Sequence, residues 1–109
     1  METIKRGTTP DIPVFIDGLA MDQIANIEFI FKARPTENAM AYFTKSYPDG
    51  GVTLDESGTA YVVALTEEDT RKLSAKSEVY MDTRITTING KVPQSNWIVY
   101  KVEDTGYEG

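Results

Sequence analysis

The feature that most constrains this chain is an alternation of apolar and polar side chains, repeated in short segments. In residues 26–32 the apolar positions include Ile27, Phe29 and Phe31, and Glu28 lies between the first two. Successive side chains of a β-strand point to opposite faces, so this spacing places three large apolar groups on one face. We therefore expect a strand here that buries that face.

The same kind of pattern recurs along the chain. Residues 78–88 alternate clearly, and the other strand candidates are residues 12–16, 39–47, 52–54, 61–65 and 92–102. Pro48-Asp-Gly-Gly51 is a turn, and Asn89-Gly90 favours a type I′ hairpin that folds residues 78–88 back onto 92–102. About seven short strands with turns roughly 8 to 12 residues apart predict an all-β fold, an antiparallel β-sandwich. One or two short helical turns are expected, at residues 19–24 and 66–72.

Length and composition indicate a single folded domain. The chain has 109 residues, of which 40% are hydrophobic, enough for one core and too few for two. We expect residues 1–109 to form one domain in which 103–109 is a loose polar tail.

The charge and the missing residue types exclude several classes of function. Seventeen acidic residues against eleven basic ones give a net charge of −6, which disfavours binding to nucleic acid or anionic lipid. The absence of Cys and His removes disulfides, thiolate chemistry, imidazole metal ligands and the usual general base. No apolar run is long enough for a membrane span, and the start of the chain lacks the apolar segment of a signal peptide.

Three carboxylates in a row, Glu67-Glu68-Asp69, raise the question of a metal or acid/base site. Thr66 precedes them and Asp69 lies three residues later, a variant of the capping box in which Asp replaces the usual Glu or Gln. Acidic residues in the first turn and Arg71 in the last also suit a helix dipole. We interpret the segment as a capped helical connector.

Other candidate sites do not fit the chemistry that they would need. Asp49, Asp55 and Glu56 depart from the spacing of a calcium loop, so we interpret them as a solvated hairpin loop. Ser74 and Lys76 lie in a polar stretch unsuited to Ser-Lys catalysis. The sequence therefore predicts no catalytic residue, no metal ligand and no cofactor.

The aromatic residues are more informative. The last strand candidate is apolar on both faces: Trp97 and Val99 alternate with Ile98 and Tyr100. A sandwich buries one face of each strand in its own core, so the other face must be covered by a loop or by a partner. Because Trp and Tyr are enriched at interfaces, we predict an interface that contains the residues Trp97, Val99, Tyr42 and Tyr47.

Three stretches resemble one family. They are Arg6-Gly-Thr-Thr-Pro10, Leu65-Thr-Glu-Glu-Asp-Thr70, and Arg84-Ile-Thr-Thr followed by Asn89-Gly90. The chain is similar to small tail- or baseplate-associated proteins encoded in phages and prophages of Gram-positive bacteria, and more distantly to the N-terminal domain of phage baseplate upper proteins. The resemblance implies an immunoglobulin-like β-sandwich, a role by assembly and no catalytic residues. The chain departs from the family pattern between Pro35 and Gly58 and at Trp97 and Tyr100.

The expected function is that of a non-enzymatic structural or adaptor component of a phage tail or baseplate. Its expected partners are tail or baseplate proteins, with a homo-oligomer left open, and neither nucleic acid nor membrane. The expected location is the host cytoplasm during assembly and then the phage particle. The alternative is a carbohydrate-binding module in which Trp97, Tyr42 or Tyr47 stacks on sugar rings, and a third reading is a carboxylate-dependent hydrolase.

Overall fold

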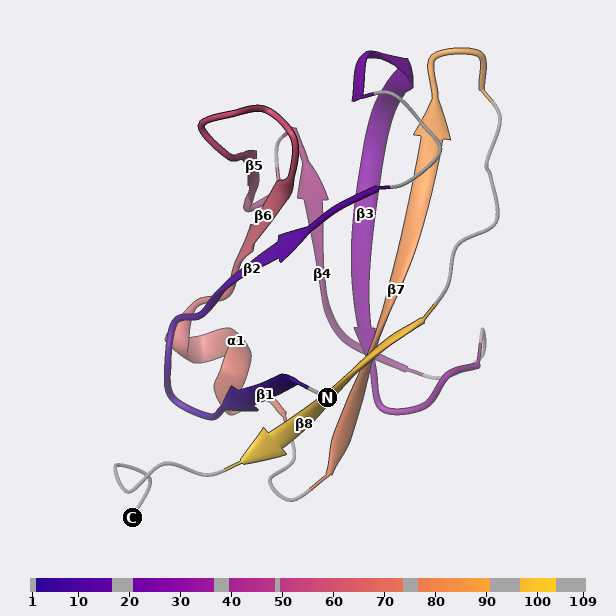
Figure 1. Ribbon diagram of the computed structural model, residues 1–109. Helices are drawn as coiled ribbons and strands as arrows, with labels where there is room; N and C mark the ends of the chain where they lie inside the picture. Colours follow the sequence, from indigo (N-terminus) through magenta and orange to yellow (C-terminus); the bar gives the residue numbers. More distant parts are fainter. Residues whose placement is uncertain are drawn as a thin grey trace.

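Two β-sheets face each other in the computed structural model, which describes residues 2–16, 21–36, 40–48, 50–73, 77–90 and 97–103 (Figure 1). One sheet has five strands in the order β1-β8-β7-β3-β4, and the other has three in the order β2-β6-β5. The strands are β1 (Glu2–Lys5), β2 (Asp11–Val14), β3 (Ile24–Lys32), β4 (Ala41–Tyr47), β5 (Val52–Leu54), β6 (Tyr61–Ala64), β7 (Glu78–Thr87) and β8 (Ile98–Glu103). The helical segments are the 3-10 helix η1 (Met21–Gln23) and the α-helix α1 (Glu67–Arg71). The predicted all-β sandwich with short helical turns is confirmed.

The core lies between the sheets and follows the alternation in the sequence. Ile27, Phe29 and Phe31 of β3 are fully buried, as predicted. From the opposite sheet Tyr61 approaches Phe29, with 6.3 Å between ring centroids. The remaining buried apolar side chains of the strands are Ile4, Ile12, Val14, Ile24, Val52, Val63, Val79, Met81, Ile85, Tyr100 and Val102.

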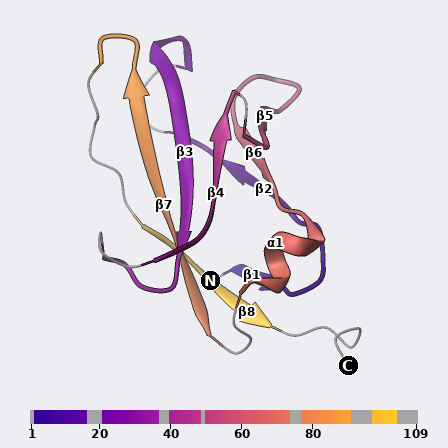
Figure 2. The same cartoon turned by 180° about the vertical axis from the view of Figure 1, so that it is seen from behind.

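The strand order is that of an immunoglobulin-like domain. The constant type pairs strands A, B, E and D in one sheet and C, F and G in the other, and the variable type adds C′ beside C. With β2 as strand B and β8 as strand G, the sheets here read B-E-D and G-F-C-C′. Figure 2 shows β7, β3 and β4 side by side from behind, with β2 farther away. This order confirms the immunoglobulin-like sandwich.

The first strand is the main departure from the prediction. β1 was not predicted, and it pairs in parallel with β8 rather than with the sheet that contains β2. Glu2 faces Tyr100 and Lys5 faces Glu103. All other pairs of strands are antiparallel among the described residues. The sandwich is therefore antiparallel except at this edge and at an isolated parallel bridge between Ser46 and Gly51.

Several predicted boundaries shift. The strand predicted at 12–16 ends at Val14, and Phe15 after it is 66% exposed. Ile98, at the start of β8, is 39% exposed, although it points to the same side of the strand as the buried Tyr100. Residues 17–20, 92–96 and 104–109 lie outside the described residues.

The predicted hairpin at Asn89-Gly90 agrees with the register of its strands. Met81 faces Ile98, and these two residues are equally far along the chain from the Asn89-Gly90 pair. Gly90 has a positive φ of 79°, a conformation that glycine adopts without strain. The hydrogen bond from the Gly90 N–H to the Thr87 carbonyl, at 2.9 Å, centres the described turn one residue earlier than predicted.

Candidate functional site

The side of the five-stranded sheet that is turned away from the three-stranded sheet is called the outer face here. Since Ile27, Phe29 and Phe31 point inward, their neighbours on β3 point outward, and the strand register carries this assignment across the sheet. The charged and apolar side chains of the outer face are Lys5, Glu28, Ile30, Lys32, Glu78, Tyr80, Asp82, Arg84, Val99, Lys101, Glu103 and, just before β8, Trp97. No described helix or strand lies against this face (Figure 2).

Trp97 and Val99, two of the predicted interface residues, lie on the outer face. Both are half-buried. The ammonium group of Lys32 lies 5.6 Å from the centroid of the Trp97 ring, which is the distance of a cation–π contact. Lys32 also donates a hydrogen bond to the carbonyl oxygen of Thr36 at 3.3 Å. The Trp97 ring therefore covers Lys32, which is only 8% exposed.

Two apolar residues of the outer face were missed as candidates. Tyr80 lies opposite Val99 on one side and opposite Lys32 on the other. Ile30 lies opposite Asp82, and both Ile30 and Tyr80 are half-buried. The signal was present in the sequence, because Ile30 falls between the two inward-facing phenylalanines and must point outward if they point inward.

The other two predicted interface residues, Tyr42 and Tyr47, pack against the core from β4. Tyr47 lies opposite Ile27 on the inner face, and its ring is 5.3 Å from that of buried Tyr61 in an edge-to-face arrangement. The structure does not bring Tyr47 together with Trp97, which belongs to the other face of the sheet. An interface role for Tyr42 and Tyr47 stays a prediction.

The acidic segment at 67–69 forms the capped helix α1 that the sequence predicted. The Asp69 N–H donates to the Thr66 hydroxyl at 3.1 Å, and the Thr66 N–H donates to Oδ2 of Asp69 at 2.9 Å. Both bonds of the capping box are thus present. Glu67 forms an ion pair with Arg71 one turn later.

Asp69 does more than cap the helix, and this was not predicted. Its Oδ2 lies 2.6 Å from Nζ of Lys45 on β4, and both side chains are largely buried, with exposed fractions of 11% and 14%. Burial alone would raise the pKa of Asp69, but Lys45 and the Thr66 N–H stabilise the carboxylate and hold its pKa below the usual value. The ion pair ties α1 to the edge strand of the five-stranded sheet.

The helix α1 also holds the turn between β1 and β2. The hydroxyl of Thr70, fully buried, accepts a hydrogen bond from the Gly7 N–H at 3.0 Å and donates to the carbonyl of Thr8 at 2.9 Å. Arg6 donates to the carbonyl of Arg71 at 3.1 Å. The segments Arg6–Pro10 and Leu65–Thr70, far apart in the sequence, are therefore neighbours in the fold.

Of the predicted loop carboxylates, Asp55 stabilises its own loop, and Glu56 is exposed. Asp55 accepts hydrogen bonds from the N–H groups of Thr59 (2.8 Å) and Ala60 (3.3 Å) and from the Ser57 hydroxyl (3.0 Å). The bond from the Thr59 N–H contributes most to a lowered pKa of Asp55. In the described part of the chain no three Asp or Glu residues are grouped so that they could hold a metal ion. Asp49, Ser74 and Lys76 lie outside that part.

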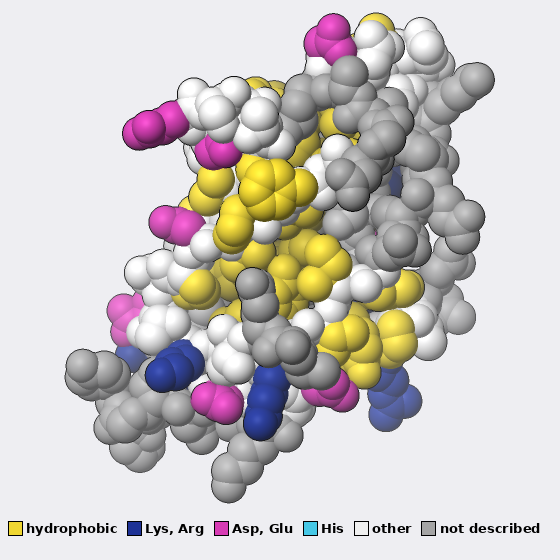
Figure 3. All heavy atoms as spheres, viewed as in Figure 1, with side chains coloured by type: hydrophobic (Ala, Val, Ile, Leu, Met, Phe, Trp, Pro, Cys, Tyr) yellow, Lys and Arg dark blue, Asp and Glu magenta, His cyan; other side chains and the backbone are white. Residues whose placement is uncertain are grey.

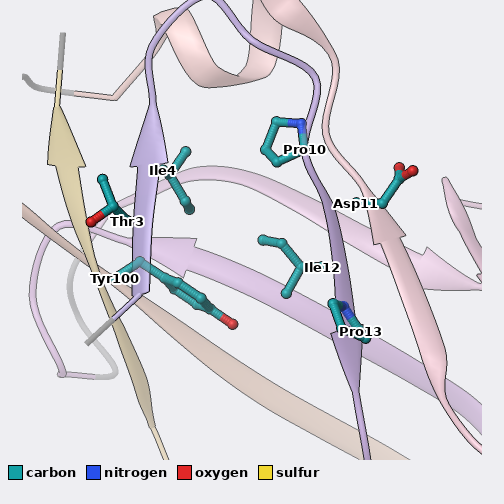
Figure 4. Close-up of a pocket in the computed structure, with 7 residues that line it drawn as sticks. All are labelled: Thr3, Ile4, Pro10, Asp11, Ile12, Pro13 and Tyr100. Carbon is teal, nitrogen blue, oxygen red and sulfur yellow. The ribbon is translucent and has the colours of Figure 1, made fainter.

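A groove opens at the seam between the two sheets, where β1 and β2 are edge strands. Its volume is about 330 Å³, and its lining residues are Thr3, Ile4, Pro10, Asp11, Ile12, Pro13 and Tyr100 (Figure 4). Hydrophobic side chains gather in the middle of this side of the molecule (Figure 3). Ile4, Ile12 and Tyr100 are each 5% exposed or less, so they belong to the core. The groove is the open edge of the sandwich.

Comparison with known proteins adds little to the geometry. Neither a family model nor a curated protein matches the chain. Among the solved structures, the chain is similar to the extracellular domain of the voltage-gated sodium channel beta4 subunit, solved as a parallel homodimer and described in terms of cell-cell adhesion. The two are 15% identical over 94% of this chain and 91% of that one, with a TM-score of 0.43. The strand order described above is what identifies the immunoglobulin-like fold. Among the described helices, none is both long and apolar enough to cross a bilayer.

Proposed function

We propose that this chain is a non-enzymatic assembly module that binds other proteins through the outer face of its five-stranded sheet. The resemblance in its sequence motifs favours a phage tail or baseplate as the setting. In that setting its partners are tail or baseplate proteins, which it binds in the host cytoplasm during assembly.

One observation carries this proposal. Four half-buried apolar side chains, Ile30, Tyr80, Trp97 and Val99, lie on the outer face, where no described element covers them. Side chains of this kind are typical of protein interfaces, where aromatic residues are enriched and where apolar area leaves water on binding. The inner face of the same strands already packs in the core. Another protein can therefore cover the outer face without competing with the core.

The alternative, carbohydrate binding, has less support. A sugar platform needs aromatic rings that are open on one face and converge on one site. Lys32 lies over the Trp97 ring at 5.6 Å, and Tyr42 and Tyr47 pack against the core. Trp97 would therefore have to act without the two tyrosines.

Copurification from phage particles, followed by sedimentation velocity with individual tail and baseplate proteins, tests the proposal. Trp97→Ala should weaken complex formation at least tenfold, because interface tryptophans are among the residues whose truncation costs most. Glu68→Ala, on the exposed side of α1, is the control and should bind as the unaltered chain does. Absence of the chain from particles, together with no binding to any tail protein, would exclude the proposal.

A further inference from the structure

We propose that the outer face binds a second copy of the same chain, in a two-fold symmetric dimer in which Glu28 of each copy pairs with Arg84 of the other. The inference rests on the proposed function, since it names the partner of the same face. It rests on how charge is distributed over that face and on the register between β3 and β7.

The outer face is electrically balanced although the chain is acidic. On β1, β3, β7 and β8 its acidic side chains are Glu28, Glu78, Asp82 and Glu103, and its basic ones are Lys5, Lys32, Arg84 and Lys101. These charges cancel, so the net charge of −6 belongs to the rest of the chain. Two copies repel each other through most of their surfaces and can approach through this one.

The order of charges along the two central strands makes the face self-complementary. Tyr80 lies opposite Lys32, Asp82 opposite Ile30, and Arg84 opposite Glu28. Consider a two-fold axis that runs parallel to the strands in the plane of contact, in front of the line midway between β3 and β7. It stacks β3 of each copy on β7 of the other. It places Arg84 against the partner's Glu28, and Tyr80 at the level of the partner's Lys32, where the Trp97 ring covers that lysine.

Glu28 and Arg84 are available for such contacts. They are cross-strand neighbours, yet no ion pair in the described part of the chain uses either. Glu28 is half-buried and Arg84 is exposed. The half-buried residues Ile30, Tyr80 and Val99 follow them along one side of the same face and would lose water on contact.

Charge reversal gives a sharp test by sedimentation velocity over a concentration series. The unaltered chain should dimerise, and Glu28→Arg or Arg84→Glu alone should weaken the dimer at least tenfold, because each places like charges opposite one another twice. An equimolar mixture of the two single variants should form a heterodimer, since both contacts become Arg against Glu. The double variant E28R/R84E should dimerise again. Glu67→Arg on α1 is the control and should leave the dimer unchanged.

The mixture distinguishes a contact between two copies from an ion pair of Glu28 with Arg84 inside one chain. Mixing the two single variants restores the first and cannot restore the second. Thermal melts of each variant show whether it is folded. A monomeric unaltered chain up to about millimolar concentration, or two folded single variants that dimerise as well as the unaltered chain, would overturn the inference. If the chain is monomeric and still binds tail proteins through Trp97, the dimer is wrong and the proposed function stands. If it dimerises through Glu28 and Arg84 and binds no tail protein, the dimer is confirmed and the proposed function is wrong.

Discussion

At the scale of single residues, Asp69 shows how one carboxylate combines roles that the sequence suggested only in part. It accepts the Thr66 N–H, which closes the helix cap, and it also binds Lys45 on β4, an edge strand of the five-stranded sheet. Lys45 is an inward-pointing charge on an edge strand, a feature that discourages uncontrolled pairing of edges. The ion pair lets that charge point inward without remaining unpaired.

Asp69→Asn should destabilise the fold by about 1 to 3 kcal/mol at pH 7, since the amide can still accept the Thr66 N–H but leaves Lys45 without a counter-charge. The effect should depend on pH. Because the pKa of Asp69 is lowered in the folded state, its contribution is present above the usual carboxyl pKa and is lost as the pH falls through the folded value. Urea denaturation from pH 7 to pH 2 measures this.

The unaltered chain should therefore lose more stability on acidification than Asp69→Asn, and the two curves should converge at low pH. Glu67→Gln, which removes only the exposed ion pair with Arg71, is the control and should cost less than about 0.5 kcal/mol. Parallel curves for the unaltered chain and Asp69→Asn would show that the ion pair with Lys45 contributes nothing.

At the scale of elements, α1 links the sheets rather than merely connecting β6 to β7. It has only five residues, too short to be stable alone, so its contacts with the rest of the fold must hold it. The Thr70 hydroxyl satisfies the Gly7 N–H and the Thr8 carbonyl of the turn between β1 and β2. Gly7, with a φ of 78°, provides the left-handed conformation of that turn.

Thr70→Val keeps the shape of the side chain and removes its hydroxyl. It should cost about 1 to 3 kcal/mol, since the Gly7 N–H then lies in a part-buried site without its acceptor. Chemical denaturation gives the value, and hydrogen exchange of the Gly7 amide should accelerate. Thr44→Val, on an exposed position of β4, should be neutral within about 0.5 kcal/mol. If Thr70→Val proves as stable as Thr44→Val, the hydrogen bonds of Thr70 do not stabilise the fold, and α1 does not link the sheets through them.

The elements that the sequence predicted are those with a local signal. The alternation around Phe29 and in residues 78–88 gave both the strands and the faces that they bury, and Thr66 with Asp69 gave the cap. β1 has no such signal, because Ile4 is its one apolar side chain in the core and its partner β8 lies at the other end of the described chain. The Lys45–Asp69 ion pair could not be predicted from the sequence either, because only the packing of the fold brings these two residues together.

The candidate surface was predicted in part for the same reason. Trp97 and Val99 stood out because their strand is apolar on both faces. Tyr42 and Tyr47 were chosen by residue type, and type alone does not fix the face of a strand that contains a bulge, as the β3–β4 pair does beside Phe31.

At the scale of the whole molecule, the two faces of the five-stranded sheet should differ in what their side chains contribute. Phe29→Ala removes a fully buried ring and should cost about 3 to 5 kcal/mol of folding stability. Trp97→Ala removes a half-buried ring and a cation–π contact worth about 0.5 to 1 kcal/mol, so it should cost clearly less. Thermal melts at a concentration where the chain is monomeric make the comparison. If the two variants lose equal stability, Trp97 is ordinary core and the interface lies elsewhere.

The parallel pairing of β1 with β8 has a consequence for synthesis on the ribosome. β1 leaves the exit tunnel before every other described strand, and the strand that pairs with it leaves last. At typical translation speeds of 5 to 20 residues per second, that delay is roughly 5 to 20 seconds. Throughout it Ile4 has no partner strand, because β8 is the one described strand that pairs with β1. β1 can therefore take its place in the sheet only after the whole of β8 has been synthesised, so this edge of the sandwich forms after translation of the other described strands.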